Sequence, residues 1–244
     1  MTFCLGIKVN DGLIALADTQ IVKGDERLNK AKLSMKGDSN GHWWIMTSGL
    51  RSIRDKAMIY LEEEAAQQNV QYGRLYEIAN MFGKQLRRVR SEDGAALAAS
   101  NFAFNLHAII GGKLANDLEP CMYYIYPEGN WIESNPDSPY FIVGRTPYAK
   151  PILDQLLTNK LDIRHALTVA FLAFDATRSC VTDVGFPIDV ILSDPRTNRV
   201  TQSRFDLNDL QSASEWWHNH LVCSLSQFPT DCFSSLFTEN RSQE

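Results

Sequence analysis

The chain opens with Met1-Thr-Phe-Cys-Leu-Gly-Ile-Lys-Val-Asn-Asp-Gly-Leu-Ile-Ala-Leu-Ala-Asp18, which contains two apolar runs and a turn signal. The runs are Phe3 to Val9 and Leu13 to Ala17, and Asn10-Asp-Gly12 joins them. Asp-Gly favours a type I′ turn, because both central residues of that turn need φ > 0. The stretch therefore predicts an antiparallel hairpin that brings Asp18 close to the beginning of the chain.

Thr2 follows the initiator methionine, which is normally removed in the cytoplasm when the next residue is small. Removal would leave a hydroxyl and a free α-amine on one residue. The nucleophile and its candidate base would then belong to the same residue, as in the threonine variant of acyl-transfer enzymes. Taken alone, Thr2 is simply the second residue, so this interpretation depends on the groups that fold beside it.

Two charged residues lie where the predicted strands approach Thr2. Asp18 ends the second apolar run, sixteen residues after Thr2. Lys32 belongs to the alternating run Ala31 to Met35, which predicts the next strand after a polar turn at Lys23-Gly-Asp-Glu26. An ammonium beside the α-amine would lower the pKa of that amine and favour an alkoxide. A strand-end acid and a solvated surface lysine are the ordinary alternatives.

The rest of the chain alternates between strand and helix patterns. The predicted strands are His42–Thr47, Phe104–Ile110, Pro120–Tyr126, Tyr140–Val143, Pro187–Asp194 and Arg199–Arg204, with a turn at Asp194–Asn198. The predicted helices are Arg51–Asn69, Gly73–Arg90, Pro147–Thr158, Ile163–Ser179 and Leu207–Leu221. Ser91 to Ser100 predicts a loop. Thr146 before a proline and Asp162 predict helix N-caps.

The order of elements predicts the fold class. Helices occur in pairs between groups of antiparallel strands, which favours α+β layers over a doubly wound parallel sheet. A length of 244 residues suits one domain, or at most two, with a sizeable core. We expect a single domain over residues 1–244, in which residues 207–244 form a C-terminal helix and a polar tail.

Composition excludes several classes of partner. A net charge of -5 argues against general binding of nucleic acid or of an acidic membrane surface. No apolar run approaches the ~18 residues that a membrane helix needs, and no secretory signal is visible, so we expect a cytoplasmic protein. The five cysteines are scattered, and the chain has no Gly-rich phosphate loop. We therefore expect neither a metal nor an organic cofactor.

These features together resemble the proteasome β-subunit family. The shared features are a threonine at the mature start, a strand ending in an acid, a lysine strand and an apolar strand closing on glycine: Thr2, Ala17-Asp18, Lys32-Leu33 and Ser48-Gly49. Three further segments are similar to the bacterial proteasome homologues called Anbu: Phe141–Leu153, Phe174–Arg178 and Val184–Asp189. The similarity spans roughly residues 2 to 205.

The resemblance implies the four-layer αββα sandwich of the N-terminal nucleophile hydrolases. It implies that Thr2 is the nucleophile and that its amine is the general base. Asp18 would orient Lys32 and balance its charge. The backbone N–H of Gly49 would face the developing oxyanion, where a preorganised donor has a large effect on acyl transfer.

The supporting serine and aspartate of the family have no assigned counterpart in this sequence. Gly144-Arg-Thr146 stands where a small residue followed by serine is expected. Asp183 is the nearest acid but is out of register, and Asp175 falls within a predicted helix.

We therefore expect a threonine-type peptidase or amide hydrolase that acts through an acyl-enzyme on Thr2. The resemblance also implies a homo-oligomer, either a ring or a helical assembly, that acts on peptide or protein substrates. A separate unfoldase would have to supply any ATP dependence. Two alternatives stay open: a small-amide hydrolase or acylase on the same fold, and a self-assembling scaffold with a vestigial site.

Overall fold

The computed structural model describes residues 2–23, 26–38, 41–68, 72–195 and 199–237. The chain divides into two compact units, Met1–Leu207 and Asn208–Glu244. The strands are β1 (Phe3–Val9), β2 (Gly12–Asp18), β3 (Gln20–Lys23), β4 (Glu26–Asn29), β5 (Leu33–Asp38), β6 (Gly41–Ser48), β7 (His107–Leu114), β8 (Cys121–Ile125), β9 (Trp131–Glu133), β10 (Tyr140–Gly144), β11 (Ile188–Asp194) and β12 (Arg199–Phe205). The helices are α1 (Arg51–Gln68), α2 (Leu75–Ala99), α3 (Lys150–Leu156), α4 (Ile163–Cys180), α5 (Leu207–Gln227) and α6 (Ser234–Phe237).

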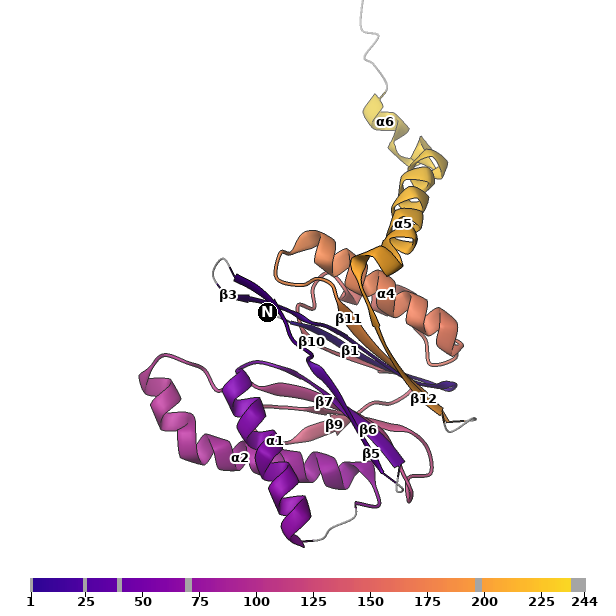
Figure 1. The fold of residues 1–244 in the computed structure, drawn as a ribbon. Coiled ribbons are helices and arrows are strands. Elements are labelled where there is room, and N and C mark those ends of the chain that lie inside the picture. Colours follow the sequence, from indigo (N-terminus) through magenta and orange to yellow (C-terminus); the bar gives the residue numbers. More distant parts are fainter. Residues whose placement is uncertain (1, 24–25, 39–40, 69–71, 196–198, 238–244) are drawn as a thin grey trace, which may run out of the picture. The chain divides into compact units, whose positions relative to one another are not determined.

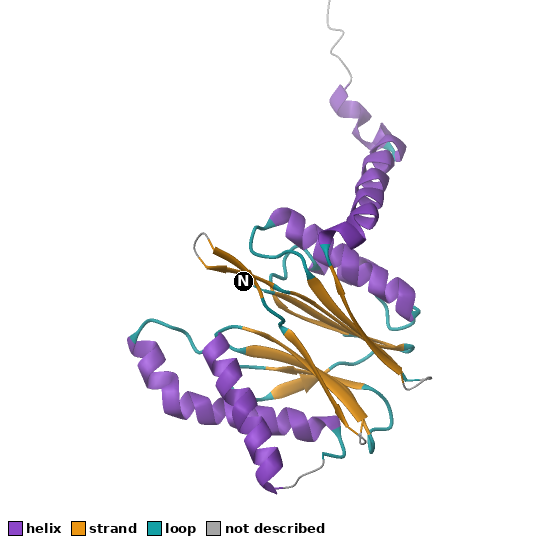
Figure 2. Cartoon of the chain, in the orientation of Figure 1, coloured by secondary structure: helices purple, strands orange, loops and turns teal. Residues whose placement is uncertain are grey.

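The first unit is a sandwich of four layers. Among its described residues, two five-stranded antiparallel sheets have the orders β10-β1-β2-β11-β12 and β5-β6-β7-β8-β9. Helices α1 and α2 cover the outer face of the second sheet, while α4 packs on β1 and β2 with α3 beside it (Figures 1 and 2). The predicted α+β class and the αββα layering are confirmed.

Apolar side chains fill the spaces between these layers. Leu13 and Ala15 of β2 meet Trp44 of β6 between the two sheets. Phe82 of α2 packs near Ile110 of β7 between the helices and the second sheet. All seven residues of β2 are buried, because this strand has neighbours on both edges and on both faces. Burying a large apolar side chain contributes about 1.5–3 kcal/mol, so these layers are the main source of stability.

The predicted first hairpin is present in the sheet. Val9 pairs with Gly12 and Cys4 pairs with Ala17. Gly12 has φ of +146°, and a Cβ there would lie 2.1 Å from the carbonyl oxygen of Ser193, so the turn requires glycine. The pairing brings Asp18 to the start of β1.

Residues after the first hairpin form a second, short one. Gln20 pairs with Asn29 and Lys23 pairs with Glu26. The sequence predicted only a polar turn here, and part of that turn lies outside the described residues. Lys32 was predicted inside a strand, but it lies just before β5. The prediction missed the short hairpin because its polar residues lack an apolar alternation.

Helix α2 is longer than predicted, and the loop expected from Ser91 to Ser100 is wrong. The helix continues to Ala99, and its extension is bound to α1 by side chains. Lys56 Nζ lies 2.6 Å from Glu92, and the hydroxyl of Tyr60 donates to Glu92 at 2.8 Å. The alanines of this segment also have the highest helix propensity. The small residues of this segment predicted a loop, but in the structure they continue the helix.

The other boundaries differ by a few residues. Helix α3 begins at Lys150, three residues later than predicted, and its N-cap is Ala149. Thr146 is therefore not the N-cap, although its carbonyl accepts two hydrogen bonds in the preceding turn. Asp162 does cap α4, because its side chain accepts from two backbone N–H groups of the first turn. Strand β9 was not predicted.

The second unit consists mainly of α5, which continues past the predicted end at Leu221. A 3₁₀ helix (Thr230–Phe233) and α6 follow it. Every residue of α5 is described, and none is buried. The single domain expected over residues 1–244 stays a prediction, as do the helix end at Asn69 and the turn at Asp194–Asn198, which fall partly outside the described residues. Across the described chain, no helix is both long and apolar enough to cross a membrane.

The contacts of Lys56 and Tyr60 on α1 with Glu92 on α2, here called the clamp, generate a prediction about the pH dependence of stability. Hydrogen bonds from Lys56 and Tyr60 lower the pKa of Glu92 to about 2. Glu92 therefore stabilises the fold above its unfolded pKa, and this contribution is lost as pH falls toward 2. We expect Lys56→Met to lower Tm at pH 6, and the gap to wild type to narrow as pH falls from 4.5 through about 2. Thermal unfolding, followed by circular dichroism, measures this difference in Tm at each pH.

The exposed Lys160 provides the matched control. Lys160→Met removes the same charge away from α1 and α2, so its Tm should follow that of wild type throughout. A Lys56→Met gap that stays constant down to pH 2.5 would contradict the assignment to Glu92.

Candidate active site

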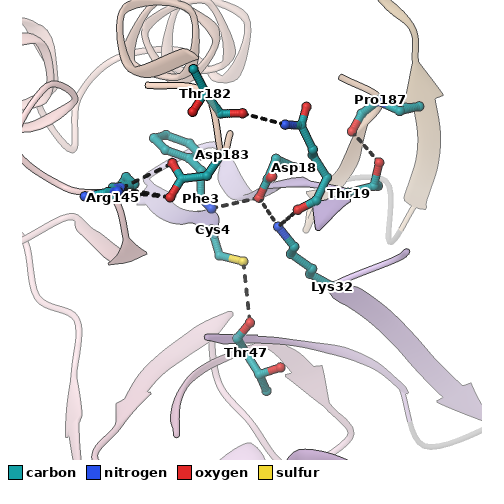
Figure 3. A network of polar contacts seen from close by, with 11 residues as sticks. Phe3, Cys4, Asp18, Thr19, Lys32, Thr47, Arg145, Thr182, Asp183 and Pro187 are labelled. Atoms are coloured by element: carbon teal, nitrogen blue, oxygen red, sulfur yellow. Dashed lines mark hydrogen bonds and ion pairs between the residues drawn. The ribbon is translucent and has the colours of Figure 1, made fainter. Parts of the chain in front are cut away.

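Asp18 is the centre of the candidate site. It ends β2, and its side chain is fully buried, with 0% exposed. Its Oδ1 atom accepts a hydrogen bond of 2.7 Å from the backbone N–H of Phe3 and another of 2.7 Å from Lys32 Nζ (Figure 3). A buried carboxylate is tolerated only when charges or donors compensate it. One oxygen therefore holds both the start of β1 and Lys32.

Lys32 is almost as deeply buried as Asp18, with 8% exposed. Its ammonium also donates to the backbone carbonyl of Gln20 at 2.7 Å. The short β3–β4 hairpin lies between Asp18 and Lys32 in the chain, and it returns the backbone so that the two charges meet. Burial raises the pKa of Asp18, while Lys32 and the Phe3 N–H work in the opposite direction.

The peptide group that joins Thr2 to Phe3 is held at its carbonyl and at its N–H. Its carbonyl accepts a hydrogen bond of 2.8 Å from the N–H of Arg145, and the next N–H, that of Phe3, donates to Asp18. Gly144 has φ of +97°, and a Cβ there would lie 1.8 Å from the Thr2 carbonyl oxygen. Only glycine allows this close approach. Thr2 itself is buried, with 9% exposed.

The alternation of side chains along β1 indicates where Thr2 faces. The ring of Phe3 packs edge-on against Phe174 of α4, with centroids 5.7 Å apart. Cys4 points the other way, and its Sγ lies 3.9 Å from the carbonyl oxygen of Thr47 in β6. Continued by one residue beyond β1, this alternation predicts that Thr2 shares the face of Cys4, toward the second sheet.

Gly49 follows directly on that second sheet. It lies between the end of β6 and the start of α1, two residues after Thr47. Its φ is +128°, and a Cβ would lie 2.5 Å from the carbonyl oxygen of Asn105, so the turn into α1 requires glycine. Strand β6 thus leads to Gly49 at the end of the sandwich that holds Thr2. The oxyanion role of its N–H stays a prediction.

Arg145 and Asp183 are neighbours of Thr2 to which the sequence assigned no role. The guanidinium of Arg145 donates to both carboxylate oxygens of Asp183, at 3.0–3.3 Å. Burial disfavours the charged form of Asp183, but hydrogen bonds from Arg145 hold its pKa below the ordinary value. The other acid considered, Asp175, pairs instead with Arg178 within α4.

The resemblance pointed to Gly144-Arg-Thr146 as the place of a supporting serine, but it gave Arg145 no role and did not show its placement. This placement follows from the antiparallel pairing of β1 with β10, in which Phe3 lies opposite Gly144. Within the described ranges, no group of three or more His, Cys, Asp or Glu side chains could hold a metal ion.

Comparisons with known proteins agree with this geometry. Residues 2–191 match the family model described as proteasome subunit. Curated proteins gave no match. Among solved structures, a Gly-1 mutant of Anbu from Hyphomicrobium sp. strain MC1 is 27% identical, with a TM-score of 0.84, and the match covers 93% of this chain and 99% of that one.

Two further Anbu structures show the same fold at lower identity. Anbu (ancestral beta-subunit) from Yersinia bercovieri is 23% identical with a TM-score of 0.85, over 93% of this chain and 98% of its own. The helical assembly of the Anbu complex from Pseudomonas aeruginosa is 24% identical with a TM-score of 0.85, over 93% and 97%.

The buried ion pair yields a stability prediction. Asp18→Ala would leave the Lys32 ammonium buried without its carboxylate and should cost about 3–5 kcal/mol of unfolding free energy. Urea denaturation measures this cost. The double variant Asp18→Ala/Lys32→Met should recover part of it, because no charge is then left unpaired. A double variant that loses the sum of the two single losses would contradict the pairing.

Proposed function

Because the chain belongs to the proteasome subunit family, we propose that it is a threonine-type peptidase that acts through an acyl-enzyme on Thr2 after Met1 is removed. One observation carries this proposal. The buried Oδ1 of Asp18 binds both the Phe3 N–H and Lys32 Nζ, at 2.7 Å each. This contact fixes a positive charge beside the residue that would begin the mature chain.

The first half of the proposed reaction forms an ester on Thr2. Thr2 Oγ attacks the carbonyl carbon of the substrate amide, and the α-amine takes the hydroxyl proton, directly or through a water. Lys32 lowers the pKa of that amine, and the N–H of Gly49 donates to the developing oxyanion. The C–N bond then breaks, and the ammonium returns the proton to the leaving amine.

The second half of the reaction removes the acyl group. Water attacks the ester carbonyl, and the α-amine of Thr2 takes one of its protons. Collapse of the intermediate breaks the bond to Thr2 Oγ, which receives that proton. The carboxylic acid product leaves, and the amine and the hydroxyl return to their starting forms.

We propose peptides or proteins as substrates and a homo-oligomer, either a ring or a helical assembly, as the working form. The helical assembly of the Anbu complex from Pseudomonas aeruginosa supports the proposed homo-oligomer. Rotation between neighbouring subunits decides whether such an assembly closes or continues. A cytoplasmic location and, for folded substrates, a separate unfoldase complete the proposal.

Intact mass and covalent labelling test the proposal. We expect purified protein to lack Met1 and to gain one adduct per chain, at Thr2, with a β-lactone or epoxyketone probe. Thr2→Ala should abolish the adduct. Lys32→Met should slow the formation of the adduct by at least about 100-fold, because the amine would lose the neighbouring cation that lowers its pKa. Thr201→Ala, which removes an exposed hydroxyl on β12, should label like wild type.

Retention of Met1 would place the amine on the wrong residue and contradict the proposal. An absent adduct, with Thr2→Ala leaving every measured activity unchanged, would favour the scaffold. A peptide library compared with a panel of small amides separates a peptidase from an acylase on the same site.

A further inference from the structure

A second pocket-bearing region lies at the end of β1 that is opposite to Thr2. The two sheets of the first unit face each other there (Figure 1), and residues of both sheets line a pocket of about 400 Å³. Lys8, which lines this pocket, comes six residues after Thr2 in the chain. At the rise of a β-strand this separation is about 20 Å. The pocket is therefore distinct from the candidate active site, and its volume suits a small organic molecule.

Lys8 faces the second sheet from β1. Cys4 belongs to the apolar cluster between the sheets, and a Cβ on Gly6 would lie 2.7 Å from the sulfur of Met122 in β8. Side chains alternate along a strand, so Lys8, two residues after Gly6, has the same orientation. Its side chain is 19% exposed. The first sheet thus holds an ammonium group at the edge of the space between the sheets.

Lys113 faces the first sheet from β7. Ile109 belongs to the cluster between the sheets, whereas Leu114 packs in the cluster beneath the helices. Alternation along β7 therefore directs Lys113 to the same side as Ile109, and its side chain is partly buried. Both lysines line the one pocket, so two ammonium groups from facing sheets meet in a partly enclosed space.

A buried hydroxyl lies on the same wall as Lys113. The N–H of Ser134, which follows β9, donates to the carbonyl of Met122 at 2.9 Å and continues the pairing of β9 with β8. Paired residues share a face of the sheet, so Ser134 lies on the side of Met122, between the sheets. Ser134 is 4% exposed, and among the described residues its Oγ has no hydrogen-bond partner. A buried hydroxyl in this state is unfavourable unless a ligand binds it.

The acids that line the pocket do not balance both lysines. Glu119 lies 3.5 Å from Lys8 Nζ and is 73% exposed, so water screens this ion pair. Glu133 lies opposite Tyr123, which packs beneath the helices, so its strand position faces away from the first sheet. Within the described ranges, Lys113 has no ion pair. The walls between the sheets therefore present mainly positive charge.

We propose that this pocket binds a small organic dicarboxylate. One carboxylate accepts hydrogen bonds from Lys113 Nζ and from the Ser134 hydroxyl, and the other displaces the exposed Glu119 from Lys8. The carbon chain between the carboxylates covers the apolar part of the lining, which a bare inorganic anion leaves exposed. This part includes Val9, Pro120 and Pro136. The inference does not depend on the proposed peptidase.

Glutarate is the probe, because it carries a carboxylate at each end of a short carbon chain. Pentanoate, with the same chain and a single carboxylate, is its matched control. Isothermal titration calorimetry of the full chain at low ionic strength should show that glutarate binds at least about 10-fold more tightly than pentanoate or inorganic phosphate.

Variants locate the binding site. Lys8→Met and Lys113→Met should each weaken glutarate binding by at least about 10-fold, because each removes a charged donor. Lys36→Met removes the same charge from β5, where the ammonium binds Glu62 of α1 at 2.7 Å, and should bind glutarate like wild type. Thr2→Ala should also bind like wild type.

Ser134→Ala separates a binding role from a structural one. The hydroxyl has no described partner to lose, so the Tm of the free protein should be no lower than that of wild type. Glutarate binding should nevertheless weaken by about 3- to 10-fold, because the carboxylate loses a donor. A lower Tm with unchanged glutarate affinity would assign the hydroxyl to the fold and remove it from the proposed site.

Three results would overturn the proposal. These are no binding of glutarate, equal glutarate affinity in wild type and both folded lysine variants, and phosphate binding as tight as that of glutarate. The last would mean that the pocket attracts charge without selecting a dicarboxylate. Circular dichroism reports folding, and if Lys8→Met does not fold, Lys113→Met decides alone. Labelling of Thr2 by a β-lactone has no bearing on these outcomes, so the peptidase and the pocket can fail separately.

Discussion

A single buried carboxylate oxygen organises one end of this molecule. Asp18 Oδ1 accepts from the Phe3 N–H and from Lys32 Nζ, and its side chain has no exposed surface. A charge in such a place is stable only if its partners are held at the correct distance. The hairpin of β1 and β2 supplies one partner, and the short β3–β4 hairpin delivers the other. Local turn geometry therefore decides whether a buried ion pair can form.

The two sheets contribute different parts of the candidate site. The first sheet carries Thr2 between the ends of β2 and β10, and its close approach to Gly144 excludes any side chain there. The second sheet leads to Gly49 through β6, whose Thr47 meets Cys4 across the core. The apolar packing between the sheets thus sets the separation of the predicted nucleophile and the predicted oxyanion donor. Core and site cannot be changed independently.

Charge at this end is balanced between two ion pairs. Lys32 pairs with Asp18 beside the start of β1, and Arg145, which follows β10, pairs with Asp183. Each pair contacts the backbone beside Thr2 through one of its members, because Asp18 accepts from the Phe3 N–H and Arg145 donates from its backbone N–H to the Thr2 carbonyl.

The sequence alone predicted the first hairpin, the fold class and the nearness of Asp18 to Thr2, because turn chemistry and periodicity are local properties. It placed Lys32 in a strand and ended α2 at Arg90, since neither a short polar hairpin nor a clamp by Lys56 leaves a periodic signal. Arg145 and Asp183 lie 38 residues apart and far from Thr2 in the chain. The pairing of β10 with β1 brings Arg145 to Thr2, and the pairing of β11 with β2 brings the segment of Asp183 to the same end. Both pairings depend on how whole strands pack in the sandwich.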